Sequence, residues 1–327
     1  MSRRQRRGEG VAVVVEIAQG PRCRDVNLTM DDGVVLAVRD LGGPDAVHTV
    51  VFLHGLCLSQ VCWARQIDYL VDRYGPAVRI ISYDHRGHGR SGQAPMRSYR
   101  IERLAEDLAA VLAGLQVSGS VTLVGHSMGG MAALGYLGLD RRPVEPAGLV
   151  LVATAAGKLC HRGLGRMLRT PATAALFGVV DRAPQIALTA MVGPLCSALG
   201  RCRRPASAVT VAAVAADALA AVSVATAVGF LPALRDYDQY PMLATIRART
   251  VVLSGGADPL TPAAHGRDLA AAIPGAEHVE IPAAGHMLPL EAPQVVHQAI
   301  RRAIAIDTSS CGVDRRAAVP VLAGVAS

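Results

Sequence analysis

A serine between glycines follows an apolar run near the middle of the chain. Gly125, His126, Ser127, Met128 and Gly129 form a G-x-S-x-G sequence that comes after the run SVTLV and before a helical pattern of small residues. A sharp turn between a buried strand and a helix lifts such a serine Oγ above the sheet, and the two glycines relieve crowding there. The start of the helix also offers free N–H groups that favour developing negative charge. The pattern predicts a nucleophilic serine, against the alternative of an ordinary strand-to-helix turn with a buried serine.

A serine hydroxyl needs a base, so this pattern requires a histidine further along the chain and an acid to orient it. His286 lies in AAGHMLPLE, in a loop after the last expected strand (278–282), and Asp258 ends LSGGAD, where the preceding strand stops. The order Ser, Asp, His is the one expected for a sheet of this kind. We therefore expect Ser127 as the nucleophile, His286 as the general base and Asp258 as the acid.

Plainer interpretations exist for the acid and for the other histidines. Asp258 could cap a helix that begins near Pro262, and it could do so while it also orients the base. The chain holds ten histidines, and His265, His278 and His297 fall on expected helix or strand surfaces. For these three we expect solvated or locally hydrogen-bonded roles.

Acyl transfer also needs hydrogen-bond donors aimed at the oxygen that becomes negative in the transition state. The segment FLHGLCLS places His54 and Gly55 directly after an expected strand. The backbone N–H groups of Leu56 and of Met128, the residue after the nucleophile, are expected to form this oxyanion hole. His54 is expected to brace the loop rather than to transfer protons.

The hydrophobic pattern predicts the elements that position these residues. Helical patterns at 101–115 and 128–138 alternate with apolar, β-branched runs that suit strands buried on both faces of a parallel sheet. Two weaker strands, 24–30 and 34–40, are joined by a D-D-G turn signal and predict an antiparallel edge. The fold class is therefore α/β, a doubly wound, mostly parallel sheet of the eight-stranded kind. The buried strands are expected at 48–55, 78–84, 120–127, 147–154 and 249–258.

The pattern changes after the fourth buried strand to alanine-rich helical segments broken by prolines. We expect a helical cap over residues 156–245, inserted into a core formed by residues 23–155 and 246–306. Residues 1–22 are expected to be a basic tail that leads into a strand, and residues 307–327 a loose C-terminal tail.

Composition narrows the class of protein. Hydrophobic residues make up 51% of the 327 residues and charged residues 18%, which favours a globular fold. The net charge of +7 could suggest a nucleic-acid partner, but no aromatic residues interleave with the scattered arginines, so we expect none. The apolar stretch 205–234 carries Asp217 at its centre and would separate the two halves of the site, so we expect packed helices and no transmembrane segment.

Seven cysteines occur without the spacing of metal ligands, so we expect neither a metal site nor a disulfide framework, which fits a reducing cytoplasm. The N-terminal basic and apolar stretch is similar to a short signal peptide, but Glu16 interrupts it and no cleavage site follows. The oligomeric state stays open.

The motifs resemble those of the α/β-hydrolase fold family, in particular its lid-bearing serine esterases, lipases and haloperoxidase-like members. HGLCLS, YDHRGHGRS, GHSMGG, LSGGADPLTP and AAGHMLPLEAP carry the resemblance, in family order, over about residues 25–305. The resemblance implies no cofactor, and it implies a structural role for the loop from Asp84 to Ser91, with Arg86 and His88. Epoxide hydrolases and haloalkane dehalogenases of this fold have aspartate as the nucleophile, so Ser127 excludes both.

The expected activity is hydrolysis of a small or medium apolar carboxylic ester through an acyl-enzyme on Ser127. The Ala-, Val- and Leu-rich cap suggests the apolar group. The same three residues could instead serve a cofactor-free C–C bond hydrolase, or a haloperoxidase or perhydrolase. From another class, a ligand-binding, receptor-like module is the alternative, because this fold also serves in ligand sensing.

Overall fold

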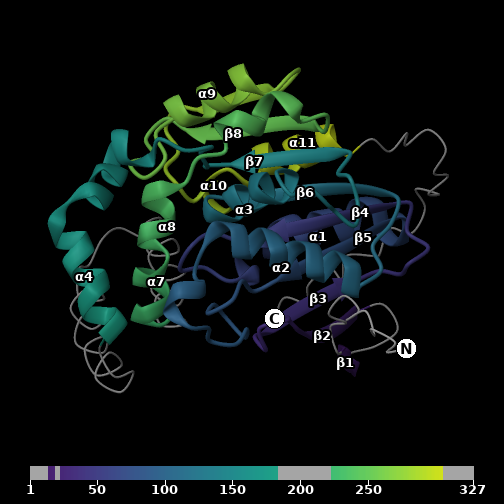
Figure 1. Cartoon of the computed structure of the whole chain (residues 1–327). Helices are drawn as coiled ribbons and strands as arrows, with labels where there is room; N and C mark the ends of the chain where they lie inside the picture. The colour runs from purple at the N-terminus through teal and green to yellow at the C-terminus, as the bar shows by residue number, and fades with distance from the viewer. Residues whose placement is uncertain (1–13, 19–22, 183–221, 305–327) are drawn as a thin grey trace, which may run out of the picture.

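The computed structural model describes residues 14–18, 23–182 and 222–304, and its centre is one twisted sheet (Figure 1). Nine strands follow the order β1-β2-β3-β5-β4-β6-β7-β8-β9. The pairs from β1 to β5 are antiparallel, and the pairs from β5 through β4 to β9 are parallel. The strands are Val14–Ala18 (β1), Cys23–Thr29 (β2), Val35–Leu41 (β3), His48–Leu53 (β4), Val78–Tyr83 (β5), Ser120–His126 (β6), Gly148–Val152 (β7), Arg249–Gly255 (β8) and Glu277–Ile281 (β9).

The mostly parallel α/β sheet expected from the sequence is confirmed. All residues of β4, β5 and β7 are buried, because these β-branched runs lie between two layers of helices. The D-D-G turn does join β2 to β3, and Gly33 takes the positive φ of 83° that the turn requires. β1 adds a further antiparallel strand at the edge, within the stretch where a tail leading into a strand was expected.

Helices cover both faces of the sheet and bury two separate apolar clusters. Helices α2, α3 and α9 contribute to the cluster on one face, and α1 and α11 contribute to the cluster on the other. The short α10 precedes α11. The bounds are Ala64–Tyr74 (α1), Ile101–Gly114 (α2), Met128–Leu137 (α3), Ala264–Ala272 (α9), Leu288–Glu291 (α10) and Pro293–Ala303 (α11).

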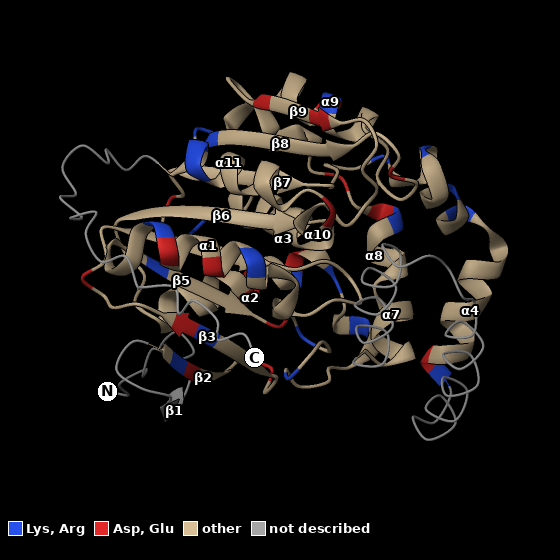
Figure 2. Ribbon diagram, turned by 180° about the vertical axis from the view of Figure 1, so that it is seen from behind, with Lys and Arg blue, Asp and Glu red and all other residues tan. Residues whose placement is uncertain are grey.

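Helices and 3₁₀ turns predominate in the described part of the segment between β7 and β8, which also holds an isolated antiparallel bridge between Gly157 and Asp238. Figures 1 and 2 both place α4, α7 and α8 together at one end of the sheet. Residues 205–221 of the apolar stretch lie outside the described residues. None of the helices in the described ranges combines the length and the hydrophobicity that a bilayer crossing needs. The elements are the 3₁₀ turns η4 (Leu159–His161), η5 (Gly163–Arg169) and η6 (Tyr240–Thr245), and the helices α4 (Pro171–Arg182), α7 (Val224–Gly229) and α8 (Leu231–Asp236).

Candidate active site

Ser127 occupies a strained turn between β6 and α3. Its φ of 52° and ψ of −119° lie in a region that a residue with a side chain rarely adopts. The turn is held by the end of β7 and the residues after it, because the Ser127 amide donates to the carbonyl of Val152 at 2.9 Å and Thr154 Oγ1 donates to the Ser127 carbonyl at 2.7 Å. The neighbouring strand therefore fixes the serine at the carboxyl end of the sheet, directly before the first turn of α3.

The two glycines of the G-x-S-x-G sequence allow α3 to pack directly against the sheet. A Cβ atom on Gly125 would lie 2.6 Å from the carbonyl oxygen of Gly129, and a Cβ atom on Gly129 would overlap the carbonyl of Leu53 in β4. Neither neighbour can move, since both belong to the backbone. These glycines are thus required by close approach of helix and sheet, as the sequence predicts.

Asp258 and His286 form a hydrogen-bonded pair. The imidazole Nδ1–H donates to Asp258 Oδ2 at 2.7 Å, so the basic lone pair of the ring resides on Nε2. The same carboxylate accepts the amides of Leu260 and Thr261 at Oδ1, at 2.8 and 3.0 Å, and the Thr261 hydroxyl at Oδ2, at 2.7 Å. The loop after β8 therefore surrounds the buried carboxylate with donors.

These donors set the charge of Asp258. Burial raises the pKa of the carboxyl, but the hydrogen bond and charge of His286, together with the bonds from Thr261, outweigh burial and lower the pKa to about 2. The carboxylate is therefore ionised at neutral pH. It does not cap α9, which begins at Ala264 without a side-chain cap, but it holds the turn that leads to that helix.

Two residues that the sequence analysis did not select hold the loop of His286. His126 Nε2–H donates to the His286 carbonyl at 2.9 Å, and burial lowers the pKa of His126 to about 3, which keeps it neutral. The Glu291 carboxylate accepts the amides of Gly285 and Met287, at 2.6 and 2.9 Å, on either side of His286. Glu291 is the glutamate of AAGHMLPLEAP, so this motif held the sequence signal for its contacts with the two amides.

His54 orients the peptide that carries one expected oxyanion donor. The amide of His85 donates to His54 Nε2 at 2.9 Å, so Nδ1 carries the proton and donates to the Gly55 carbonyl at 2.8 Å. That carbonyl and the Leu56 N–H belong to the same peptide unit, so fixing one directs the other. Neither the Leu56 amide nor the Met128 amide donates to any residue that the structure describes, which leaves both available for a ligand.

His88 orients the following peptide in the same way. Its Nε2 accepts the Cys57 amide at 3.2 Å, and its Nδ1–H donates to the Arg86 carbonyl at 2.9 Å. Burial lowers the pKa of His88 to about 3, so this acceptor nitrogen stays unprotonated. His54 and His88 lie with their ring centres 5.2 Å apart beneath the loop that carries Leu56.

The remainder of the loop from Asp84 to Ser91 makes structural contacts. Asp84 accepts the amides of Gln60 and Arg90, at 2.8 and 2.9 Å, and the buried Arg86 forms a two-point ion pair with Asp107 in α2, at 2.7 Å for each bond. The contacts join α2 and the β5 loop, as the resemblance implies for this segment.

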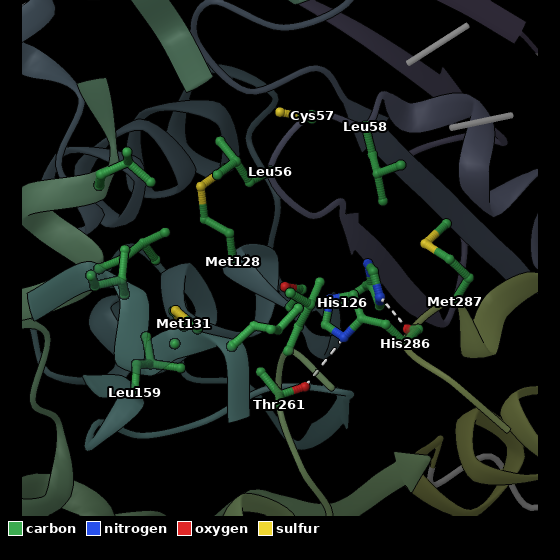
Figure 3. Close-up of a pocket in the computed structure, with 17 residues that line it drawn as sticks. Leu56, Cys57, Leu58, His126, Met128, Met131, Leu159, Thr261, His286 and Met287 are labelled. Atoms are coloured by element: carbon green, nitrogen blue, oxygen red, sulfur yellow. Dashed lines mark hydrogen bonds between the residues drawn. The ribbon is translucent and has the colours of Figure 1, made fainter. Parts of the chain in front are cut away.

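A cavity of about 420 Å³ opens above Ser127 and His286 (Figure 3). This volume is typical of small-molecule sites. Asp258, His54, Gly55, Gly125 and Gly129 lie behind its surface. The lining residues are Leu56, Cys57, Leu58, His126, Ser127, Met128, Met131, Leu159, Leu164, Gly165, Leu168, Leu231, Leu234, Leu260, Thr261, His286 and Met287.

Within the described residues, no hydrogen bond joins the side chains of Ser127 and His286, although both line this cavity. Catalytic contacts are often long without substrate and shorten when it binds.

The expected surface position of His265 is wrong. This residue of α9 is only 1% exposed, and neither ring nitrogen has a hydrogen-bond partner among the described residues. His278 Nε2 lies 3.1 Å from Ser254 Oγ, and the His297 ring stacks on Tyr69 with 4.2 Å between centres, so these two have local roles. Helical periodicity placed His265 on α9 but did not show which face of that helix packs inward.

Comparison with known proteins agrees with this geometry. Residues 48–293 match the family described as alpha/beta hydrolase fold. A putative 2-succinyl-6-hydroxy-2,4-cyclohexadiene-1-carboxylate synthase of Bacillus subtilis is 37% identical over 134 residues, which are 40% of this chain and 45% of the relative. A bifunctional esterase/perhydrolase of Acinetobacter calcoaceticus is 34% identical over 132 residues, again 40% of this chain and 45% of the relative. The chain thus matches less than half the length of these curated relatives.

Solved structures match over a longer span. A hydrolase from Pseudomonas aeruginosa superposes with a TM-score of 0.66 and 26% identity, covering 86% of this chain and 98% of the other.

Proposed function

Since this chain belongs to the alpha/beta hydrolase fold family, we propose that it is a serine hydrolase that cleaves carboxylic esters through an acyl-enzyme on Ser127. The observation that carries the proposal is the Asp258–His286 pair, which lies beside the strained Ser127 turn at the base of one apolar cavity. Asp258 holds His286 in the tautomer whose Nε2 accepts a proton. This is the arrangement that turns a serine hydroxyl into a nucleophile.

The proposed reaction has two halves. His286 Nε2 takes the proton of Ser127 Oγ as the oxygen attacks the ester carbonyl, and the Leu56 and Met128 amides donate to the oxyanion. Collapse of this intermediate breaks the bond to the alcohol oxygen, which takes the proton from His286. Water then attacks the acyl-enzyme in the same manner, with His286 as base, and releases the acid.

The cavity supports an apolar ester of small or medium size. Leucine and methionine side chains make up most of its lining, and several come from the helical segment between β7 and β8. We therefore include in the proposal that residues 156–245 act as a cap on a core of residues 23–155 and 246–306. The proposal includes a cytoplasmic location, because the cysteine usage of the sequence indicates no disulfide framework. It also includes no nucleic-acid partner, because the arginines are scattered.

A perhydrolase activity is the second candidate, because one relative is named a bifunctional esterase/perhydrolase. In that reaction hydrogen peroxide would replace water in the attack on the same acyl-enzyme and release a peracid. A comparison of acid and peracid formation from one ester, with and without peroxide, separates the two activities.

Labelling with a fluorophosphonate probe tests the proposal. We expect the wild type to be labelled and Ser127→Ala and His286→Ala to remain unlabelled, with His297→Ala as a labelled control. Hydrolysis of a nitrophenyl ester should follow the same pattern. A wild type that binds the probe reversibly without labelling would contradict the proposal and favour a receptor-like module.

A further inference from the structure

The cavity at Ser127 has two apolar walls that belong to different apolar clusters of the molecule. The wide wall packs in a cluster with the buried Phe230 and Tyr237 of the helical segment. The narrow wall packs in the cluster beneath α1 and α11. Figure 3 shows Met128, Met131 and Leu159 to the left of the two histidines, Met287 to their right and Leu58 above them. We define the wide wall as Leu56, Met128, Met131, Leu159, Leu168 and Leu234, and the narrow wall as Leu58 and Met287.

The two walls differ in origin. The wide wall combines α3 of the core with η4, η5 and α8, so it lies where the helical segment meets the core. Leu58 follows β4 and Met287 follows His286 directly, so the narrow wall comes from core loops alone. The wide wall thus has six side chains against two, and a substitution in α8 changes the wide wall without changing a residue of the narrow wall.

The chemistry of ester cleavage assigns one substrate group to each wall. The alcohol oxygen must lie within reach of His286 Nε2, because it takes its proton from that atom when the C–O bond breaks. The water of the second half-reaction must occupy the same position, since His286 activates it. The space beside His286 is thus vacated and refilled in each cycle, whereas the acyl group stays on Ser127 throughout.

We propose that the wide wall binds the acyl chain and the narrow wall binds the alcohol group, which makes the substrate an ester of a medium-length apolar acid and a short alcohol. This assignment rests on the proposed function. Each methylene of the acyl chain that the wide wall covers leaves water, and its burial should raise kcat/KM about fourfold. As defined, the narrow wall has two side chains against six on the wide wall, so the gain from lengthening the alcohol should level off after fewer carbons than the gain from lengthening the acid.

Two ester series measure the assignment. One series varies the acid from acetate to dodecanoate with nitrophenol as the common alcohol, and the other varies the alcohol from methanol to hexanol with butyrate as the common acid. Leu234→Trp in α8 and Met287→Trp form a matched pair, because each fills a partly exposed lining position on one wall.

We expect Leu234→Trp to lower the octanoate-to-acetate ratio of kcat/KM about tenfold or more, with the hexyl-to-methyl ratio within twofold of wild type. Met287→Trp should show the reverse pattern. Leu234→Ala and Met287→Ala enlarge the same positions and should shift the same two ratios in the opposite direction, which covers the case of a tryptophan variant that fails to fold.

The assignment would be overturned if each tryptophan variant changed the octanoate-to-acetate and hexyl-to-methyl ratios equally. It would also be overturned if Leu234→Trp changed only the hexyl-to-methyl ratio and Met287→Trp only the octanoate-to-acetate ratio. In both cases the esterase proposal would stand. A wild type that hydrolyses no ester and is not labelled by fluorophosphonate would instead overturn the proposed function itself.

Discussion

The polar base of the cavity and its wide wall are built by different physical means. At the base, Ser127, Asp258 and His286 are each held by directional hydrogen bonds from strands and loops of the core. Along the wide wall, leucine and methionine side chains are held by apolar packing alone. Directional bonds fix atoms to a few tenths of an ångström, whereas apolar packing tolerates exchange of side chains of similar volume.

The difference separates chemistry from specificity. Substitutions at the base should change kcat for every ester, and substitutions on the wide wall should change the ranking of esters. If the base of the cavity is held by directional hydrogen bonds, the loss of a single supporting contact should lower kcat or stability measurably.

The largest effect is expected for Asp258→Asn. The amide can donate to His286 Nδ1 and so favours the wrong tautomer, which removes the basic lone pair from Nε2. We expect kcat to fall about 10³- to 10⁴-fold, measured with a nitrophenyl ester. Asp236→Asn in α8, whose exposed carboxylate pairs with Arg235, serves as the control and should stay within about twofold.

Gly129→Ala should cost about 3 kcal/mol of unfolding free energy, because the added methyl group would overlap the Leu53 backbone and push α3 from the sheet. Gly178→Ala in α4 is the matched change in the helical segment, where the methyl group would meet only the flexible end of Arg182. There the substitution should be neutral or stabilising by up to about 1 kcal/mol. Urea unfolding monitored by circular dichroism gives both values, and equal losses would contradict the close approach of helix and sheet.

The pH dependence of stability should reveal the charge of Asp258. Its pKa is lowered from 3.8 to about 2, so the ionised form stabilises the fold above about pH 4, and this contribution is lost as the pH falls toward 2. The difference in Tm between wild type and Asp258→Asn should shrink as the pH falls from 4 to 2. A difference that grows on acidification would mean that burial, not hydrogen bonding, dominates this carboxyl.

His88→Ala should lower kcat about tenfold with little change in KM, because the Cys57 amide loses its acceptor and the loop that carries the proposed oxyanion donor Leu56 loses its fixed orientation. His88→Gln retains an acceptor oxygen and should recover part of kcat. Affinity for a trifluoromethyl ketone inhibitor, which forms an oxyanion, should fall in parallel with kcat in the alanine variant. If His88→Ala lowered only the stability of the protein and the folded molecules kept their affinity for the inhibitor, the role of His88 would be packing and not orientation of the loop.

The smallest effect is expected for Glu291→Ala. The exposed carboxylate joins the amides on either side of His286, and solvent can replace it as an acceptor. We expect kcat to fall about threefold, which corresponds to about 0.7 kcal/mol, because solvent replaces most of what the two exposed hydrogen bonds contribute. Glu277→Ala removes an exposed carboxylate that pairs with Arg302, and it serves as the control.

Much of the site could be predicted from the sequence because its signals are local. The G-x-S-x-G sequence specifies a turn through glycines at fixed offsets, and apolar runs specify buried strands through their side-chain pattern. Asp258 was placed at the end of one expected strand and His286 in the loop after another, and carboxyl ends of parallel strands share one edge of a sheet. The structure brings both residues into one hydrogen-bonded pair at that edge.

Several supporting contacts of the site could not be predicted, because they join segments that are distant in the sequence. The bond from His126 to the His286 carbonyl joins residues 160 positions apart, and the bond from Cys57 to His88 joins two loops that follow different strands. No periodicity encodes such a pair, because each side chain finds its partner only when the strands are ordered in the sheet. The same holds for His265, whose burial depends on what packs against α9.

The sequence by itself thus determined the type of sheet and the residues at its carboxyl edge, because strand burial and turn geometry are properties of short segments. Only the tertiary structure decided which side chains surround Ser127. The wide wall takes leucines and methionines from α3, η4, η5 and α8, which are separated by as much as a hundred residues and meet only through packing of the helical segment on the core.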